Sequence, residues 1–405
     1  MTAQATPPAV SLQRPVFIAG RLAEVRSEGA FGVSARVREL RAAGRDIADL
    51  SIGEPAFSPP AHVADAAVSA LALGARYTPP AGLPELRDAI AASLRQRGVP
   101  RRAGDIIVTP GAKTALLYSF LALVEPGSEV LVPDPGFPAY ASLAHLAGAK
   151  PVPYRDLEGI EAALTRRTRV LVLNLPGNPR GEAASPGDLE HLASLVLRHG
   201  LSVISDEIYA RLWFGDEPAA PSIAQVPGLG QRTVVVDGFS KTWAMTGWRL
   251  GFVAAPAALG SAFERLAVNG HSCAPDFVQR AGLAALHGGD ESVRAMVAEL
   301  RRRRDLLVAG LNRIPAVRCS LPAGAFYAFP DLSPVLAAAG LDATAFARHL
   351  LDDWGLAAVP GTAFGAAGEG HLRLSFAGAA DDLPRALERL AGCLDNLTSR
   401  AGIPA

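Results

Sequence analysis

Residues 169–209 read RVLVLNLPGNPRGEAASPGDLEHLASLVLRHGLSVISDEIY, and their hydrophobic pattern changes twice along the segment. Arg169–Leu173 and Leu201–Ser205 are short apolar runs, which predict strands. Between them, Pro186–His199 has the hydrophobic spacing of a helix. Two strands that are apolar throughout and are separated by a helix are typical of a parallel sheet covered on both faces.

The same alternation continues on both sides of this segment. Further apolar runs predict strands at Ile106–Thr109, Glu129–Pro133, Thr233–Val236 and Leu250–Ala254. Helical stretches lie between several of these runs, including Lys113–Val124 and Pro138–Gly148. The sequence therefore predicts an α/β protein with a large domain built on a mostly parallel sheet.

The order of predicted strands and helices in the last third of the chain differs from the alternation described above. A long charged helix is predicted over Glu291–Leu311, and its run Arg301–Arg304 is interpreted as a solvated helix face. Shorter elements then follow, with strands near Val317–Ser320, Ala325–Phe329 and His371–Phe376 and helices near Ala343–Trp354 and from Asp382. This order predicts a smaller α+β domain.

The N-terminal segment contains a predicted helix, Phe31–Ala43, and a short predicted strand, Asp49–Ile52. We expect residues 1–60 to join the small domain, which is completed by residues 301–405, and residues 61–300 to form the large domain. Residues 1–15 are rich in Ala and Pro and are expected to form a loose tail.

Composition excludes several classes of protein. A hydrophobic fraction of 49% and a charged fraction of 19% exclude a disordered chain. The net charge of +0 gives no general reason to expect a nucleic acid or an anionic membrane as partner. Met1–Pro15 lacks the pattern of a secretion signal, and the longest apolar stretch, near Leu116–Val124, is too short to span a bilayer. A cytoplasmic protein is expected.

The cysteines predict neither a disulfide framework nor a metal site. Cys273, Cys319 and Cys393 are an odd set without CxxC spacing, as expected for thiols in a reducing compartment. His191 and His199 lie on one predicted helix that offers no third ligand at metal spacing. No metal is expected.

Polar residues follow four of the predicted strands, at the ends where open α/β sheets bind ligands. These segments are Gly111-Ala112-Lys113, Asn174 to Pro179, Asp206-Glu207-Ile208-Tyr209 and Ser240-Lys241. Each has an ordinary structural explanation when taken alone, such as a helix cap or a turn. Their joint occurrence favours a site where a lysine, an acid, an amide and a phenol meet. The chain has only three candidates for amine chemistry, Lys113, Lys150 and Lys241, of which Lys150 falls in a predicted loop.

The segment Ser240–Phe252, SKTWAMTGWRLGF, resembles the class I aminotransferases, which are pyridoxal-phosphate enzymes of fold type I. The similarity is strongest to the bacterial aspartate and aromatic branch, and it covers nearly the whole chain from about Arg26. Supporting motifs are Gly53-Glu54-Pro55, Tyr77-Thr78-Pro79-Pro80-Ala81-Gly82 with Glu85-Leu86-Arg87, Asn178-Pro179, Asp206-Glu207-Ile208-Tyr209 and Arg373-Leu374-Ser375-Phe376.

The resemblance implies how this chain binds the cofactor ring. Lys241 matches the lysine that forms the Schiff base, and its freed amine then carries the proton as general base and acid. Asp206 matches the carboxylate beside the ring nitrogen, where it favours the protonated form. Asn178 and Tyr209 match the groups that hydrogen-bond the 3′-oxygen, and Phe137 matches the aromatic side chain that stacks on the ring.

The resemblance also implies a phosphate site and a dimer. The helix that opens at Gly111, Ala112 and Lys113 offers backbone N–H groups to the phosphate, and Ser240 and Arg249 match its side-chain ligands. Tyr77 matches a residue that reaches the phosphate of the neighbouring subunit. A homodimer with shared active sites is therefore expected.

For the substrate, the resemblance implies that Arg373 binds the α-carboxylate, with Gly53 and Asn178 in the same site. In the aspartate and prephenate branch, a lysine at the position of Lys113 is associated with acidic substrate side chains. Two departures from the family pattern are Arg180, where Thr is usual, and Ala56, where Asp is usual. We expect Arg180 to place a positive charge at the substrate entrance.

These matches imply an aminotransferase that moves the α-amino group of an acidic or aromatic L-amino acid to a 2-oxo acid by a ping-pong mechanism. An amino-acid oxidase, β-lyase or cyclase on the same fold is an alternative, because all share the cofactor residues. An aminotransferase-like ligand sensor is a more remote one, because only about fifty residues precede Gly53. A nicotinamide dehydrogenase is set aside, since no GxGxxG motif follows the first strand.

Overall fold

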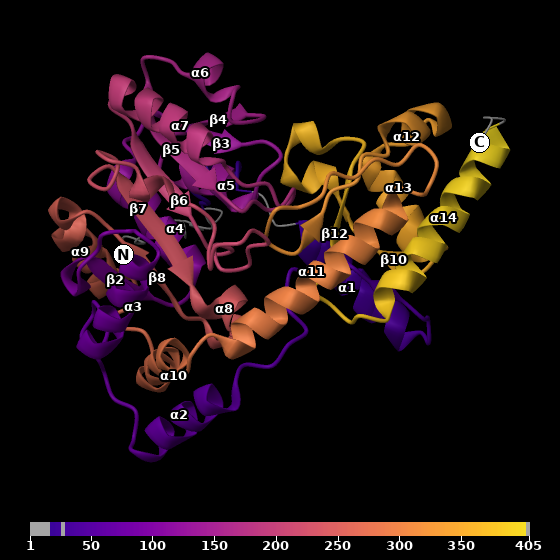
Figure 1. Cartoon of the computed structure of the whole chain (residues 1–405). Coiled ribbons are helices and arrows are strands. Elements are labelled where there is room, and N and C mark those ends of the chain that lie inside the picture. Colours follow the sequence, from indigo (N-terminus) through magenta and orange to yellow (C-terminus); the bar gives the residue numbers. More distant parts are fainter. Residues whose placement is uncertain (1–16, 26–28, 402–405) are drawn as a thin grey trace, which may run out of the picture.

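The computed structural model describes residues 17–25 and 29–401, and a seven-stranded sheet forms the centre of its larger part (Figure 1). The strands are β2 Ile106–Thr109, β3 Glu129–Pro133, β4 Lys150–Tyr154, β5 Thr168–Asn174, β6 Ser202–Asp206, β7 Thr233–Gly238 and β8 Gly251–Ala254. They lie in the order β2-β8-β7-β6-β5-β3-β4, and the pairs that β8 makes with β2 and β7 are antiparallel whereas the other pairs are parallel. The mostly parallel sheet is confirmed; the tail over residues 1–15 lies outside the described residues.

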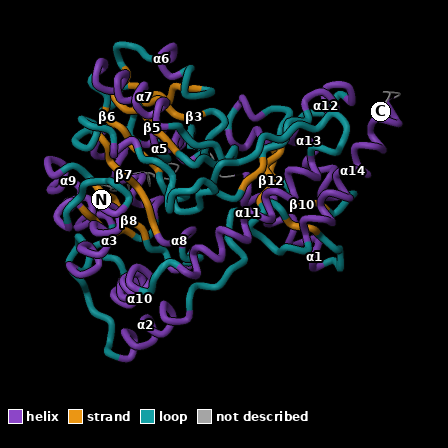
Figure 2. Tube along the Cα trace, in the orientation of Figure 1, coloured by secondary structure: helices purple, strands orange, loops and turns teal. Residues whose placement is uncertain are grey.

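The central strands are apolar throughout because helices cover both faces of the sheet (Figure 2). On β5, Val172 packs in a cluster with residues of α4 (Ala112–Leu123) and α5 (Ala139–Leu146). The next residue, Leu173, points to the opposite face and packs with α7 (Pro186–His199). Side chains alternate between faces along a strand, so both sets must be hydrophobic.

The other helices of the larger part surround this sheet. They are α2 Ala61–Ala72, α3 Pro84–Gln96, α6 Ile160–Ala163, α8 Phe239–Thr242, α9 Gly260–Gly270 and α10 Asp276–His287. Of these, α2 packs mainly on α10 and stands away from the sheet (Figure 1).

The prediction that Lys150 lies in a loop is wrong. Lys150 begins β4, which pairs in parallel with β3 at the edge of the sheet. The segment KPVPY contains two prolines, which cannot donate to a ladder and so argue against a central strand. An edge strand needs hydrogen bonds on one side only, and this is the position that the tertiary structure gives it.

The C-terminal part is a smaller α+β unit. Its helices are α11 Glu291–Leu311, α12 Ser333–Ala339, α13 Ala343–Asp352 and α14 Asp382–Ala401. Its strands β9 Tyr327–Ala328, β11 Val359–Pro360 and β12 Leu372–Ser375 form a three-stranded antiparallel sheet. The predicted strand at Val317–Ser320 is absent from the described structure beyond a single bridge. There the side chain of Asn312 takes both backbone hydrogen bonds of Cys319, in place of a strand partner.

The N-terminal segment lies against this smaller unit (Figure 1). Strand β1 (Ala48–Asp49) pairs in parallel with β10 (Leu356–Ala357), and α1 (Gly29–Ala42) packs beside it. The expected domain boundary at 300/301 falls inside the continuous helix α11, so the division of the chain into domains stays a prediction. Among the described residues, no helix is long and apolar enough to cross a membrane.

Candidate active site

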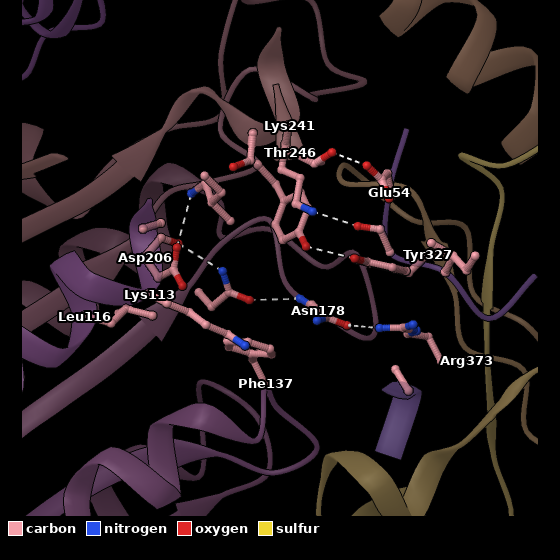
Figure 3. Close-up of a pocket in the computed structure, with 18 of the residues that line it drawn as sticks. Glu54, Lys113, Leu116, Phe137, Asn178, Asp206, Lys241, Thr246, Tyr327 and Arg373 are labelled. Atoms are coloured by element: carbon pink, nitrogen blue, oxygen red, sulfur yellow. Dashed lines mark hydrogen bonds between the residues drawn. The ribbon is translucent and has the colours of Figure 1, made fainter. Parts of the chain in front are cut away.

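The polar residues predicted at the rim of the sheet gather in one cavity of about 520 Å³ (Figure 3). The ends of β5, β6 and β7 form one wall of the cavity, and β9 and β12 of the smaller unit contribute to another. The predicted residues that line it are Gly53, Ala112, Lys113, Phe137, Asn178, Asp206, Tyr209, Ser240, Lys241, Arg249 and Arg373. Gly111 and Tyr77, which were also predicted, do not line it.

Lys241 lies in the middle of this cavity because α8 begins directly after β7. Its Nζ donates a hydrogen bond of 2.7 Å to the carbonyl oxygen of Gly53, which belongs to the N-terminal segment. Burial lowers the pKa of the Lys241 amine to about 8, against a partial opposing effect of the Glu54 carboxylate. A substantial fraction of this amine is therefore neutral, and nucleophilic, near neutral pH.

Asp206 ends β6, and its carboxylate is buried. Its Oδ2 accepts a hydrogen bond of 2.7 Å from the hydroxyl of Tyr140, and its Oδ1 accepts one of 3.3 Å from the backbone N–H of Ile208. Burial raises the pKa of Asp206 to about 6, while these two donors lower it. At neutral pH, Asp206 is mainly an anion suited to face a cationic N–H group. Sequence reasoning missed Tyr140; its only signal is its position three residues after Phe137.

Tyr209 is linked to a second residue that the sequence did not single out. Its hydroxyl oxygen lies 2.9 Å from that of Tyr327, and both rings are buried. Burial raises the pKa of the Tyr209 phenol, and the neighbouring Tyr327 raises it further. Tyr209 therefore stays protonated and can donate a hydrogen bond. A Cβ at Gly53 would lie 2.6 Å from the Tyr327 hydroxyl, which explains a glycine there. Tyr327 falls within the predicted strand Ala325–Phe329, and periodicity alone does not distinguish it from its neighbours.

Arg373 lies on β12 and is only 4% exposed. The guanidinium donates to the carbonyl oxygen of Ser51 at 2.6 Å and to Oδ1 of Asn178 at 3.4 Å. Its central carbon lies 4.6 Å and 4.9 Å from the ring centroids of Tyr327 and Phe364. A guanidinium fixed between two rings is suited to a carboxylate, which it binds through two hydrogen bonds.

The other end of the cavity is built around the start of α4. Gly111, with φ +87°, precedes the helix, and a Cβ there would lie 2.3 Å from a terminal nitrogen of Arg249. A Cβ at Gly251 would lie 2.5 Å from the backbone nitrogen of Ala112. These two glycines let the arginine and the strand come close to the first N–H groups of the helix. Together with Ser240, they make a pocket suited to an anion.

Lys113 lines the cavity from the first turn of α4. Its ammonium lies 5.4 Å from the ring centroid of Phe137 and 5.8 Å from that of Phe31, which comes from α1. Phe137 in turn makes an edge-to-face contact with Tyr140. The N-terminal segment thus contributes to the wall of the cavity next to a cation.

Two predicted residues lie elsewhere. Tyr77 is 92% exposed and does not line the cavity of its own chain. The expectation that Arg180 adds charge at the substrate entrance is not met, because Arg180 lines a different cavity and pairs with Glu182 at 2.9 Å.

Comparison with known proteins gives consistent results. The family model for class I and II aminotransferases matches residues 45–390. An aspartate aminotransferase of Musicola paradisiaca is 38% identical over 392 residues, 92% of this chain and 96% of that one. An aspartate aminotransferase of Thermus thermophilus, solved with maleate, superposes with a TM-score of 0.86 at 37% identity, covering 93% of this chain and 100% of that one. An aromatic aminotransferase of Pyrococcus horikoshii superposes at 0.82 with 38% identity, covering 89% and 99%.

Proposed function

The chain belongs to the class I and II aminotransferases and is a pyridoxal-phosphate-dependent transaminase, and we propose that its substrates are dicarboxylic amino and 2-oxo acids. The observation that carries this proposal is the charge of the cavity. Its lining has four cationic side chains, Lys113, Lys241, Arg249 and Arg373, and two acidic ones, Glu54 and Asp206. Arg249 would meet the cofactor phosphate, Arg373 the substrate α-carboxylate and Lys241 the cofactor aldehyde. Lys113 lines the same cavity, and we assign to it the second carboxylate of the substrate.

The alternatives on the same fold are not favoured, since the relatives named above are aspartate and aromatic aminotransferases. An oxidase would consume oxygen, and a lyase would release ammonia. A transaminase does neither, and the spectrum of its bound cofactor, once changed by an amino acid, is restored by a 2-oxo acid. This assay distinguishes the three reactions on one sample.

The cavity has a group for each part of pyridoxal phosphate. Ala112, Ser240 and Arg249 would hold the phosphate, and Gly111 and Gly251 let Arg249 and strand β8 pack closely against the start of α4. When bound, the cofactor supplies an aldehyde carbon that takes up an amino group and a cationic ring that withdraws electrons from the substrate Cα. Asp206 would stabilise the charge on the ring nitrogen.

The remaining residues act on the substrate and on protons. Lys241 Nζ takes the proton from the substrate Cα as a general base and returns a proton as a general acid. Tyr209 and Asn178 would donate hydrogen bonds to the ring oxygen of the cofactor, and Phe137 would pack on its ring. Arg373 binds the α-carboxylate and orients the Cα–H bond toward Lys241.

Loading of the cofactor-free protein is expected to depend on pH through Lys241. The neutral amine is the nucleophile, and its pKa is lowered to about 8 by burial. The second-order rate of loading should therefore rise about tenfold per pH unit below 8 and level off above it. Stopped-flow absorbance measures this rate. A midpoint near the ordinary lysine value of about 10.4 would contradict the role of burial.

Replacing Lys113 with serine is expected to reduce kcat/KM for aspartate and glutamate by about 10- to 100-fold, since a charge-assisted contact to the distal carboxylate is lost. The value for alanine, which has no second carboxylate, should change less than about threefold. Steady-state kinetics with aspartate, glutamate, alanine and phenylalanine measure the difference. Phenylalanine as the preferred donor of the unmodified enzyme would point to aromatic substrates instead.

Lys150→Ser is the matched control for this variant. Lys150 is the same residue type, but it lies exposed on the edge strand β4 and lines neither cavity. Replacing Lys150 should leave kcat/KM unchanged for all four amino donors. An equal loss for every donor in Lys113→Ser, with no loss in Lys150→Ser, would assign Lys113 to the phosphate end of the site and contradict the proposed substrate.

We also propose a homodimer in which Tyr77 of one subunit completes the site of the other. Tyr77 is 92% exposed and does not line its own cavity. Val68 and Leu71 on the preceding helix α2, and Leu73 directly after it, are also exposed. Exposed apolar side chains this close to Tyr77 in the sequence suit a contact between two copies.

Complementation tests the shared site. Lys241→Ala and Tyr77→Ala should each be weakly active alone, because each damages both sites of its dimer. Equimolar mixing after reversible dissociation gives hybrids in half of the dimers, and each hybrid has one intact site. About a quarter of the normal activity should return. No recovery, although hybrids are detected by mass spectrometry, would place Tyr77 outside the neighbouring site.

A cytoplasmic location is part of the same proposal. The three cysteines are free in the structure, and Cys319 and Cys393 are buried. Burial raises the pKa of the Cys319 thiol to about 11, which makes it unreactive. Such thiols suit a reducing compartment.

A further inference from the structure

A second cavity, of about 490 Å³, lies between the larger part of the chain and the smaller C-terminal unit. Arg155, at the end of β4, and Arg180 line it from the larger part. Arg318, Phe329 and His371 line it from the smaller unit. Arg180 is the departure from the family pattern that the catalytic cavity does not use.

The cavity carries an excess of positive charge. Among the described residues, neither Arg155 nor Arg318 forms an ion pair with a carboxylate. Arg180 pairs with Glu182, but its Nε is buried without a hydrogen-bond partner in the described structure. The one carboxylate in the lining is that of Asp331. Three arginines and a single acidic residue thus line one cavity, and Glu182, which is not in the lining, is paired with one of the three arginines.

One wall of the cavity is rigid and aromatic. The His371 ring is stacked on Phe329, with ring centroids 4.8 Å apart and planes 14° from parallel. The Nδ1 of His371 lies 2.9 Å from the carbonyl oxygen of Glu369 and donates to it, which fixes the ring. On the opposite wall, the guanidinium of Arg180 donates a hydrogen bond of 2.9 Å to the backbone carbonyl oxygen of Arg155, which joins these two residues.

We propose that this cavity binds a small polyanion, a molecule with two or more carboxylate or phosphate groups. Guanidinium groups bind both kinds of anion through paired hydrogen bonds, and the volume is in the range of metabolite sites. Because the arginines come from both parts of the chain, a bound polyanion links the two parts.

Two very short segments of the chain connect the second cavity to the catalytic cavity. Arg180 lies two residues after Asn178, and His371 lies two residues before Arg373. Asn178 and Arg373 are themselves hydrogen-bonded at 3.4 Å. A polyanion that holds Arg180 against the smaller unit therefore restrains the Asn178–Arg373 contact. This coupling rests on the proposed role of Arg373 in substrate binding, whereas the binding of the polyanion does not.

Isothermal titration calorimetry of the cofactor-loaded protein tests binding, with citrate as the carboxylate probe and pyrophosphate as the phosphate probe. In the double variant Arg155→Gln/Arg318→Gln, the affinity for the probe that binds more tightly should fall at least tenfold. Arg166→Gln/Arg232→Gln removes two exposed arginines that line neither cavity, and it should change the affinity less than twofold. The relative affinity of the two probes identifies the anion class.

Two results would overturn the site. One is that neither probe binds at millimolar concentration. The other is that binding persists in Arg155→Gln/Arg318→Gln and is displaced by aspartate, which would place the anion in the catalytic cavity. For the coupling, the KM for the amino donor should shift at least threefold when the probe is saturating, and this shift should vanish in the double variant. An unchanged KM with the probe bound would overturn the coupling alone.

Discussion

Lys241→Ala is expected to reduce kcat by at least about 10⁴-fold, the largest effect of any single replacement in this chain. The variant loses both the amine that attaches the cofactor and the base that removes the Cα proton. No other amine can take over, because the chain has three lysines and Lys150 lies on the edge strand β4. Lys113 lines the same cavity, but its ammonium sits over the rings of Phe137 and Phe31.

The measurement is single-turnover absorbance with excess aspartate. The phosphate pocket around Gly111 and Arg249 is untouched in Lys241→Ala, so noncovalent affinity for pyridoxal phosphate should remain detectable by equilibrium dialysis. Lys150→Ala should behave as the unmodified protein. Activity above about 1% of normal in Lys241→Ala, in a preparation free of unmodified enzyme, would show that another group removes the proton.

Asp206→Ala is expected to reduce kcat/KM by about 10³-fold or more, since the charge on the ring nitrogen loses its buried counter-ion. The replacement also leaves the Tyr140 hydroxyl without its 2.7 Å acceptor. Asp206→Glu, which keeps the charge but moves it, should recover part of the loss. Full activity in Asp206→Ala would contradict the assignment of this carboxylate to the ring nitrogen.

Tyr140→Phe tests how this carboxylate is kept ionised. The hydrogen bond from Tyr140 lowers the pKa of Asp206, which burial raises to about 6. Removing the donor raises the pKa further, so more of the carboxyl group is protonated near neutral pH. The variant should lose more activity at pH 6.5 than at pH 8.5, and its acidic limb should move to higher pH. A profile of kcat/KM against pH measures this shift.

Tyr154→Phe is the matched control for Tyr140→Phe. Tyr154 is also buried, and its hydroxyl also makes a 2.7 Å hydrogen bond, to the carbonyl oxygen of Val172. It is not part of the catalytic cavity. Its replacement should lower stability by about 1 kcal/mol and leave the pH profile in place. A shift of equal size in both variants would assign the effect to general destabilisation.

Much of the fold was predictable because the burial of a helix or strand face appears in the local sequence as a pattern of apolar residues. The strands β2 and β3 and the helices α7 and α11 begin and end at the predicted residues. Their apolar periodicity is set by the faces they bury, and that information is contained in the segment itself. Weakly marked elements were less predictable, as the proline-containing edge strand β4 shows.

The residues that gather in the proposed active site were predictable in part for a related reason. Lys241, Asp206 and Asn178 lie at or just after the carboxyl ends of parallel strands, which meet at one edge of a sheet. Tyr140 and Tyr327 carry no such mark. Each lies inside an ordinary helix or strand, and only the tertiary structure brings its hydroxyl to the site, next to Asp206 for Tyr140 and next to Tyr209 for Tyr327.

The sequence by itself determined the alternating elements, the buried parallel sheet, the family and the lysine proposed as the catalytic amine, because each depends on local period or on a contiguous motif. The tertiary structure alone decided which distant residues meet. Arg373 and Asn178 are 195 positions apart in the chain and 3.4 Å apart in space. Arg180, although it follows Asn178 by two positions, faces the second cavity instead. Such placements follow from strand order and from the packing of one unit on the other, and no local periodicity encodes them.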